Sequence, residues 1–298
     1  MIRKAVIPAA GFGTRFLPAS KSQPKEMLPI VDKPTIQYVV EEAVEAGVTD
    51  ILMIIGKGKR AIEEHFDRNF ELEAELQEQS KFEELESIRR ISSMADVHFV
   101  WQKELRGLGD AVYHARHHVG NEPFLLMLGD TLIQSEVPVA RHLIDLYERY
   151  GETVVALEPV DPAKIERYGV VGGRQISDGL YLVDKLIEKP SRAEAPSNLA
   201  IASRYAFGPK IFGYIEKTPP GKNGEIQLTD AMQLMLRDMA MYGLVFEGRR
   251  HDIGNRLDFL KTNVIYGLAR EDVGPEFREF IRKVASDLTE GRAPTTGE

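Results

Sequence analysis

The chain has 298 residues, of which 43% are hydrophobic and 28% are charged, and it contains no cysteine. These proportions are typical of a globular protein, and the lack of cysteine excludes disulfides, iron–sulfur clusters, thiolate zinc sites and cysteine nucleophiles. The net charge of −8 gives no electrostatic reason to bind nucleic acid or an anionic membrane. No apolar run approaches the roughly 20 residues of a membrane span, and the first residues lack a secretory signal, so we expect a cytoplasmic protein.

Short apolar runs alternate with helical stretches through the first half of the chain. We expect strands at residues 4–9, 50–55, 97–101, 124–128 and 153–157, and helices at residues 35–46, from about 59, at 110–119 and at 137–150. Strands that are apolar at every position are typical of sheets covered on both faces, with helices as crossovers between parallel strands. The pattern predicts an α/β fold with a Rossmann-like, mostly parallel mixed sheet flanked by helices.

The second half of the chain changes pattern. Three expected strands, at residues 169–171, 180–188 and 199–207, follow one another without helices, which predicts an antiparallel extension of the sheet. A further strand is expected at 244–247 and a last helix at 276–288. We assign residues 1–270 to one domain and residues 271–298 to a C-terminal helix with a disordered tail. Within the domain, residues 69–92 are acidic and amphipathic, which predicts a helical insertion serving as a lid or an oligomer contact.

The loop after the first expected strand, residues 9–29, is the most informative segment. It runs about twenty residues without helical or strand periodicity, which inside a compact domain indicates a functional loop. Gly11 and Gly13 allow backbone N–H groups to approach a ligand, and Arg15, Lys21 and Lys25 bring positive charge to the same place. Because open α/β sheets bind ligands at the carboxyl ends of their strands, the loop predicts a polyphosphate site.

Other glycine-rich loops fit this segment less well. A dinucleotide-binding loop needs a third glycine where Phe16 stands and an acidic residue after the second strand, which instead ends in Gly56 and Lys57. The Gly-Lys-Ser/Thr of an ATPase P-loop is absent. A purely structural loop would not explain why three cations are concentrated in it.

Two aspartates stand where strands are expected to end. Gly129 and Asp130 directly follow the run 124–128. A carboxylate there suits Mg²⁺, which prefers hard oxygen ligands, although a helix N-cap is the alternative. Asp252 follows the strand expected at 244–247 and is a candidate second carboxylate. Glu188 and Lys189 end another strand, and they would bind sugar hydroxyls and a sugar phosphate or form an ordinary surface ion pair.

Two further clusters carry weaker signals. His114, His117 and His118 have helical spacing, but Arg116 lies among them and we expect no carboxylate nearby. This favours a solvated helix face over a metal-ligand set. Residues 56–60, GKGKR, form a small basic patch, which is a weak nucleic-acid signal because the chain is acidic and no aromatic residues interleave it.

The chain resembles the sugar-1-phosphate nucleotidylyltransferases, and within them the bacterial uridylyl subgroup. The resemblance rests on an ordered set of segments that covers most of residues 1–265: GFGTRFLPASKSQPKEMLP (11–29), GKGKRAIEEHFD (56–67), GLGDAV (107–112), LGD (128–130), ERYGVV (166–171), EKP (188–190), GEIQLTDAM (224–232) and HDIGN (251–255). Asp110, in GLGDAV, replaces a histidine expected in close relatives.

The resemblance implies a role for each matching residue. Nucleotide binding falls to Ala10, Gly11, Gly13, Glu26, Gln102 and Gly107, with Glu26 and Gln102 near the base. Arg15 and Lys25 would hold the triphosphate and stabilise departing pyrophosphate. Glucose 1-phosphate binding falls to Gly169, Glu188 and Lys189, and Mg²⁺ binding to Asp130 and Asp252.

The resemblance also implies an activity. A phosphate oxygen of glucose 1-phosphate attacks the α-phosphorus of UTP in line, which releases pyrophosphate and yields UDP-glucose with Mg²⁺ as cofactor. A homo-oligomer, dimer or tetramer, is expected. Two alternatives remain open: the same reaction with dTTP, and a catalytically silent regulatory subunit that binds a nucleotide sugar.

Overall fold

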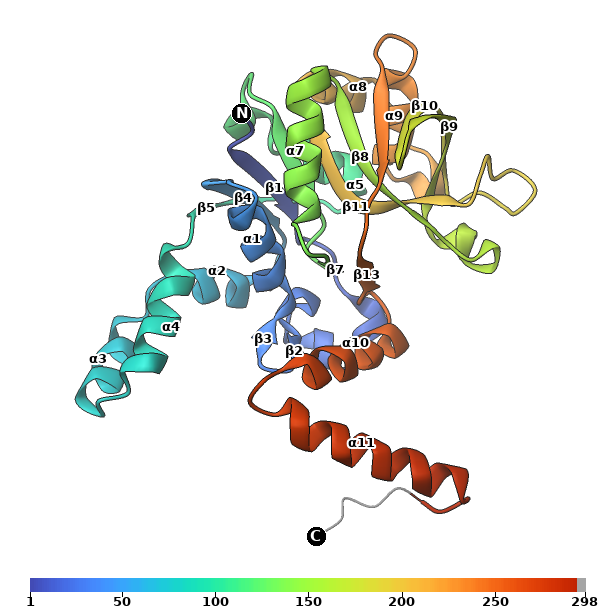
Figure 1. Ribbon diagram of the computed structural model, residues 1–298. Coiled ribbons are helices and arrows are strands. Elements are labelled where there is room, and N and C mark those ends of the chain that lie inside the picture. The colour runs from blue at the N-terminus through green and yellow to red at the C-terminus, as the bar shows by residue number, and fades with distance from the viewer. Residues whose placement is uncertain (294–298) are drawn as a thin grey trace.

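A nine-stranded mixed sheet forms the centre of the protein, seen in Figure 1 from a computed structural model that describes residues 1–293, apart from the side chain of Lys222. In spatial order its strands are β5 (Asp96–Trp101), β4 (Asp50–Ile55), β1 (Lys4–Pro8), β6 (Phe124–Met127), β11 (Leu199–Phe207), β8 (Thr153–Pro159), β12 (Met241–Val245), β10 (Leu180–Glu188) and β9 (Gly169–Ser177). The predicted α/β class and mixed sheet are confirmed.

Strand directions divide the sheet into parts. Strands β5, β4, β1 and β6 are mutually parallel, and β12 is parallel to β8. The antiparallel part is not only an extension at one edge, because β11 lies in the centre, antiparallel to both β6 and β8. Strands β9 and β10 form the expected antiparallel pair, and β9 continues to Ser177 rather than ending at Val171.

Both faces of the sheet are covered by helices, which explains the unbroken apolar runs. Alternate residues of a strand enter different hydrophobic clusters: Val6 and Leu126 lie in one, Ile7 and Leu125 in the other. The first cluster includes residues of α5 (Leu108–Tyr113), α6 (Arg116–Val119), α8 (Ile211–Lys217) and α9 (Leu228–Met235). The second includes residues of α1 (Thr35–Glu45), α2 (Arg60–Phe66) and α7 (Val139–Tyr150).

Several helices depart from the sequence prediction. The helix expected at 110–119 is broken into α5 and α6, and α8, α9 and α10 (Arg256–Ala269) were not predicted. Two short sheets complete the fold: β2 (Pro29–Ile30) pairs with β3 (Lys33–Pro34), and β7 (Thr131–Gln134) pairs with β13 (Arg249–Asp252).

A buried ion pair joins the central strand to the helical layer. Arg204 of β11 is completely buried, and its guanidinium donates to the carboxylate of Glu42 on α1 at 2.7 to 3.1 Å. The same guanidinium donates to the carbonyl of Thr131 at 2.8 Å. Loss of either partner would leave a buried charge unpaired, so the pair strongly favours one arrangement. Through the hydrogen bond to Thr131, Arg204 also fixes the backbone next to Asp130.

Two helical segments lie outside the sheet and its flanking helices (Figure 1). The predicted acidic insertion is a pair of helices, α3 (Phe70–Glu78) and α4 (Phe82–Ser93), joined by Glu73, which accepts hydrogen bonds from Arg68 and Arg89. The predicted C-terminal helix is α11 (Gly274–Thr289), and the expected disordered tail lies largely outside the described residues. Across the described residues, every helix is too short or too polar to traverse a bilayer.

Candidate active site

The loop between β1 and β2 folds back over the carboxyl ends of the parallel strands. It contains three single 3₁₀ turns, Thr14–Phe16, Ala19–Lys21 and Lys25–Met27, which leave it without the periodicity of longer elements. Gly13 has a left-handed φ of 65°, and a Cβ placed there would lie 3.0 Å from the Cβ of Lys25. Glycine at this position therefore allows the loop to close on Lys25. Lys21 is exposed and does not line the cavity described next, contrary to the expectation that it joins the phosphate site.

A cavity of about 450 Å³ opens beneath this loop. The predicted site residues that line it are Ala10, Gly11, Gly13, Lys25, Glu26, Gln102, Gly107 and Asp130. They come from four separate segments, each following one of the parallel strands β1, β5 and β6 or preceding α5. The carboxyl edge of the sheet thus brings together residues that are far apart in sequence, as expected for an open α/β sheet.

Lys25 and Asp130 form an ion pair at the floor of this cavity. The Nζ atom of Lys25 lies 2.5 Å from Oδ2 of Asp130 and 3.9 Å from the carboxylate of Glu26. Burial opposes both charges, but the charge and hydrogen bond of Lys25, a backbone hydrogen bond and the charge of Arg15 together outweigh it and lower the pKa of Asp130. In the same way, burial is outweighed by the two carboxylates, which raise the pKa of Lys25. Asp130 is not a helix N-cap, because strand β7 follows it directly.

A second ion pair lies behind the first and corrects one sequence prediction. Lys59, expected in a surface basic patch, is buried and donates to Oε2 of Glu26 at 2.8 Å. Burial raises the pKa of Glu26, although the charges of Lys59 and Lys25 partly offset it. Because its buried carboxylate is paired with a buried ammonium, Glu26 keeps one orientation beside the cavity.

Asp110, the residue that departs from the resembled family, holds Gln102. The amide nitrogen of Gln102 donates to Oδ2 of Asp110 at 2.7 Å and to the carbonyl of Gly107 at 3.4 Å. With its nitrogen engaged, the amide of Gln102 has its oxygen available to accept a hydrogen bond from a ligand. Gly107 has a left-handed φ of 103°, and a Cβ there would lie 2.8 Å from the carbonyl of Ile226.

A second cavity, of about 250 Å³, adjoins the first. It is lined by the predicted residues Gly169, Glu188 and Lys189, and it shares Leu108, Leu128 and Glu225 with the first cavity. Thr229, which the sequence analysis did not assign, donates to Glu188 at 2.7 Å, and Lys189 lies 2.9 Å from the other oxygen of that carboxylate.

Two backbone hydrogen bonds join the rims of the two cavities. The N–H of Gly109 donates to the carbonyl of Ile226 at 2.9 Å, and the N–H of Ile226 donates to the carbonyl of Arg106 at 2.7 Å. Glu225, shared by both cavities, immediately precedes Ile226. The segment before α5 and the segment before α9 therefore form one continuous rim.

Arg15 and Asp252 meet Asp130 beside Gly254. Asp252 is the last residue of β13, not a residue after β12, and it accepts hydrogen bonds from the Gly254 N–H at 3.0 Å and the Tyr168 hydroxyl at 3.2 Å. A methyl group placed on Gly254 would lie 3.0 Å from Asp252, 3.6 Å from Arg15 and 3.9 Å from Asp130. Two carboxylates facing one small space form a donor set suited to Mg²⁺.

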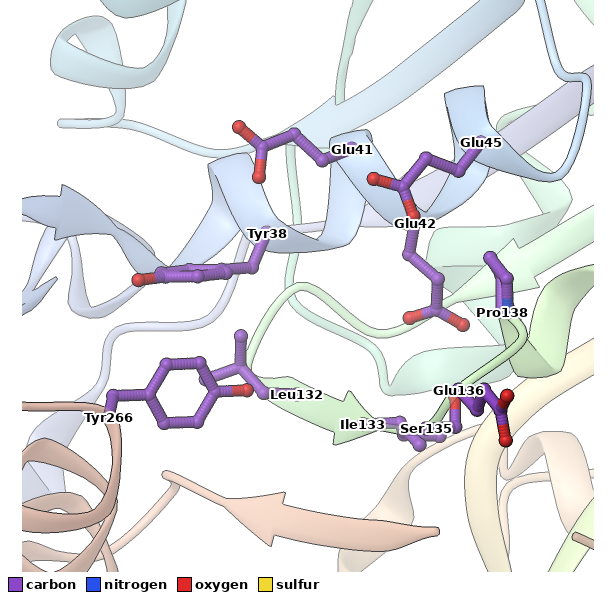
Figure 2. Close-up of a pocket in the computed structure, with 10 residues that line it drawn as sticks. All are labelled: Tyr38, Glu41, Glu42, Glu45, Leu132, Ile133, Ser135, Glu136, Pro138 and Tyr266. Carbon is purple, nitrogen blue, oxygen red and sulfur yellow. The ribbon is translucent and has the colours of Figure 1, made fainter. Parts of the chain in front are cut away.

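A third cavity, of about 160 Å³, lies on the other side of Glu42 and has the wrong charge for a phosphate. Figure 2 shows the glutamates of α1 along it, with the rings of Tyr38 and Tyr266 at one end. Its acidic lining consists of Glu41, Glu42, Glu45 and Glu136. A polyanion would be repelled here, because no lysine or arginine among the described residues lines this cavity, whereas Lys25 lines the first cavity and Arg167 and Lys189 line the second.

The three histidines singled out by their spacing do not form one group. His114 faces the backbone carbonyl of Asp110 at 2.8 Å, whereas Nε2 of His118 lies 2.7 Å from Asp50. The expectation that no carboxylate lies near them is wrong for two of them: Oδ2 of Asp110 lies 3.9 Å from Nδ1 of His114, and Asp50 approaches His118 from β4.

Comparisons with known proteins agree with this geometry. The model of the nucleotidyl transferase family matches residues 4–267. A protein of Staphylococcus saprophyticus named UTP–glucose-1-phosphate uridylyltransferase 2 is 49% identical over 283 residues, which cover 95% of this chain and 98% of the relative.

Solved structures of the same kind superimpose over most of the chain. UDP-glucose pyrophosphorylase in complex with UDP-glucose has a TM-score of 0.84 at 40% identity, covering 91% of this chain and 100% of that one. The UTP-bound enzyme of Acinetobacter baumannii has a TM-score of 0.89 at 38% identity, covering 95% of this chain and 100% of that one.

The ion pair of Lys25 and Asp130 predicts a pH-dependent stability. Because Asp130 has a pKa below its ordinary value of 3.8, its carboxylate contributes stability above that value, which is lost as the pH falls through the folded value. In Lys25→Met the main group that opposes burial is gone, so we expect the pKa of Asp130 to rise. The variant should therefore become less stable relative to the wild type as the pH rises. We expect the destabilisation, measured by urea unfolding, to be about 1 kcal/mol larger at neutral pH than at a pH below 3.8, where the wild type loses this contribution.

Lys21→Met is the matched control, since it removes one exposed lysine from the same loop. Equal destabilisation by Lys25→Met at both pH values would show that Lys25 does not control the ionisation of Asp130.

Proposed function

This chain belongs to the nucleotidyl transferase family, and from that membership we propose that it transfers the uridylyl group of UTP to glucose 1-phosphate, giving UDP-glucose and pyrophosphate. One observation carries the proposal: the residues assigned to the nucleotide and those assigned to the sugar phosphate line two adjoining cavities with a shared wall. The relatives that match nearly the whole chain are named for the same reaction.

Charge neutralisation is the main task of these side chains. The phosphate of glucose 1-phosphate is already anionic, so it needs no general base to attack the α-phosphorus of UTP. The obstacle is the approach of two anions and the charge on the departing pyrophosphate. Lys25 lines the nucleotide cavity and Lys189 lines the adjoining cavity. Arg15 lines neither cavity, and its guanidinium donates to the carbonyl of Gly254 at 3.4 Å. Preorganised cations at these positions lower the barrier by stabilising that charge and aligning the reactants.

We assign Mg²⁺ binding to Asp130 and Asp252, whose carboxylates face the same space beside Gly254. When bound there, the ion would neutralise phosphate oxygens of the nucleotide. Lys25 holds the carboxylate of Asp130 in place, and the Tyr168 hydroxyl holds that of Asp252. Both carboxylates are therefore oriented by other side chains of the same protein.

The sugar phosphate would lie in the second cavity. Glu188, oriented by Thr229, offers a carboxylate to sugar hydroxyls, and Lys189 offers an ammonium to the phosphate. A Cβ on Gly169 would lie 3.2 Å from Glu188 and 3.0 Å from Thr229, so glycine leaves the space that a sugar needs. These contacts favour a ligand-binding role for Glu188 and Lys189 over a simple surface ion pair.

For the base, the amide of Gln102 is the main contact that we assign. Asp110 engages its nitrogen, which leaves its oxygen to accept the N3–H of uracil. Thymine offers the same N–H, so this contact alone does not separate UTP from dTTP. We favour UTP because the relatives nearly half identical to this chain are named for it. A silent subunit is disfavoured because Arg15, Lys25, Asp130, Lys189 and Asp252 are all retained.

We also propose that the chain forms a homo-oligomer through α10 and α11. Leu257 and Leu260 on α10 are about 60% exposed, and Leu288 on α11 is 62% exposed. Helix α11 extends beyond the sheet in Figure 1 and buries little of its apolar face within its own chain. A second copy of the chain would cover this surface.

A nucleotide panel tests the reaction. With glucose 1-phosphate and Mg²⁺, we expect UTP to give the fastest release of pyrophosphate among UTP, dTTP, CTP and ATP. Chelation of the metal should abolish the reaction, and added Mg²⁺ should restore it. Faster turnover with dTTP would favour the thymidylyl alternative, and binding of UDP-glucose without turnover of any nucleotide would favour the silent subunit.

Two variants test the charged residues. Lys25→Ala and Asp130→Asn should each lower kcat on the order of 10²–10³-fold, because each removes a preorganised contact with the phosphates. Circular dichroism should show an intact fold. Lys21→Ala, in the same loop but outside the cavity, should keep wild-type turnover. Near wild-type turnover by either site variant would remove that residue from the mechanism.

Sedimentation velocity tests the oligomer. Replacement of both Leu257 and Leu260 by glutamate should shift the full chain to a smaller species, because it places charge in the apolar contact. Phe70→Glu on α3, where the phenylalanine is 68% exposed, is the matched control. A shift caused by Phe70→Glu and not by the α10 variant would place the interface on the acidic insertion instead.

A further inference from the structure

Two imidazoles and a carboxylate come together at the edge of the sheet opposite the active site. Asp50 is the first residue of β4, His98 lies early in the neighbouring strand β5, and His118 lies on α6. One potential ligand atom from each residue lies within 4.8 Å of the other two. The active-site segments follow the carboxyl ends of these parallel strands, so the cluster and the active site are at opposite ends of the sheet.

The arrangement exceeds what a structural hydrogen bond needs. Nε2 of His118 already lies 2.7 Å from Oδ1 of Asp50, and this contact alone would join α6 to β4. Yet Nε2 of His98 also approaches the same oxygen, at 3.8 Å, and the two imidazole rings lie 4.9 Å apart. Both histidines thus direct the same type of nitrogen toward one carboxylate oxygen.

The chemistry of this donor set selects a class of ion. Two imidazole nitrogens and one carboxylate oxygen suit Zn²⁺ and similar divalent transition metals, whereas Mg²⁺ prefers oxygen ligands. The side chains of all three residues are partly exposed, so an ion can enter and water can complete its coordination. The neighbouring ammonium of Lys4 is paired with Glu122 at 2.6 Å and donates to the carbonyl of His118 at 3.0 Å. The charge of Lys4 is therefore balanced by Glu122, and its hydrogen bond fixes the backbone of α6 at His118.

We propose that Asp50, His98 and His118 form a binding site for a divalent transition metal of the Zn²⁺ class, separate from the Mg²⁺ site. One ion bound there links β4, β5 and α6, which lie far apart in the chain. Because binding occurs only in the folded protein, the ion stabilises the fold. This site is independent of the transferase reaction.

Equilibrium dialysis against Zn²⁺ in excess Mg²⁺ tests the site. His98→Ala is the principal variant, since His98 is 52% exposed in its side chain and its removal should leave the fold intact. We expect the wild type to bind one more equivalent of Zn²⁺ than His98→Ala or His118→Ala. His117→Ala, on the same helix but outside the cluster, should bind as the wild type does.

Two further measurements separate this site from zinc bound elsewhere. Zn²⁺ should raise the Tm of the wild type and of His117→Ala more than that of His98→Ala. Co²⁺ should give visible absorption bands from imidazole coordination that are lost in His98→Ala. Equal Zn²⁺ stoichiometry and equal Tm shifts in the wild type and both ligand variants would overturn the proposal. Turnover with UTP should be unchanged in His98→Ala, so failure of this site leaves the proposed reaction untouched.

Discussion

The site depends on the balance of charge at the carboxyl edge of the sheet. An enzyme that joins two phosphates needs cations in a cavity, yet unpaired ammonium groups are costly to hold out of water before substrate arrives. Here Lys25 is paired with Asp130 and Lys59 with Glu26, so each partly buried ammonium has a carboxylate partner. The arrangement keeps the cations in position while the site is empty, and one of the same carboxylates can serve a divalent ion.

The topology explains why both cavities share a wall. Strand β11 enters the sheet antiparallel between β6 and β8, so its first residues lie at the same edge as the last residues of those two strands. Strand β9 pairs with β10 so that Gly169 lies opposite Glu188, close to where β11 begins. The residues that we assign to the sugar phosphate are thereby brought to the edge where the loop assigned to the nucleotide lies. A purely parallel sheet would not return the chain to that edge without a further crossover.

The sequence predicted the sheet well because burial on both faces leaves unbroken apolar runs, as in residues 51–55 and 124–128. It did not predict β13, whose residues Arg249–Asp252 are polar and pair only with β7. It placed Lys59 in a basic patch because neighbouring lysines look alike in sequence. Only the fold brings Glu26 against one of them. Long-range pairs such as Gln102 with Asp110, or Asp50 with His118, likewise depend on how strands and helices pack.

Two backbone hydrogen bonds connect Ile226 with Arg106, before α5, and with Gly109, in the first turn of α5, and so join the rims of the two cavities directly. A displacement of one segment would act on the other through the backbone, without a side chain as intermediary. A substitution that breaks these two backbone hydrogen bonds would therefore disturb both cavities, even though neither bond involves a charged group that we assign to phosphate binding.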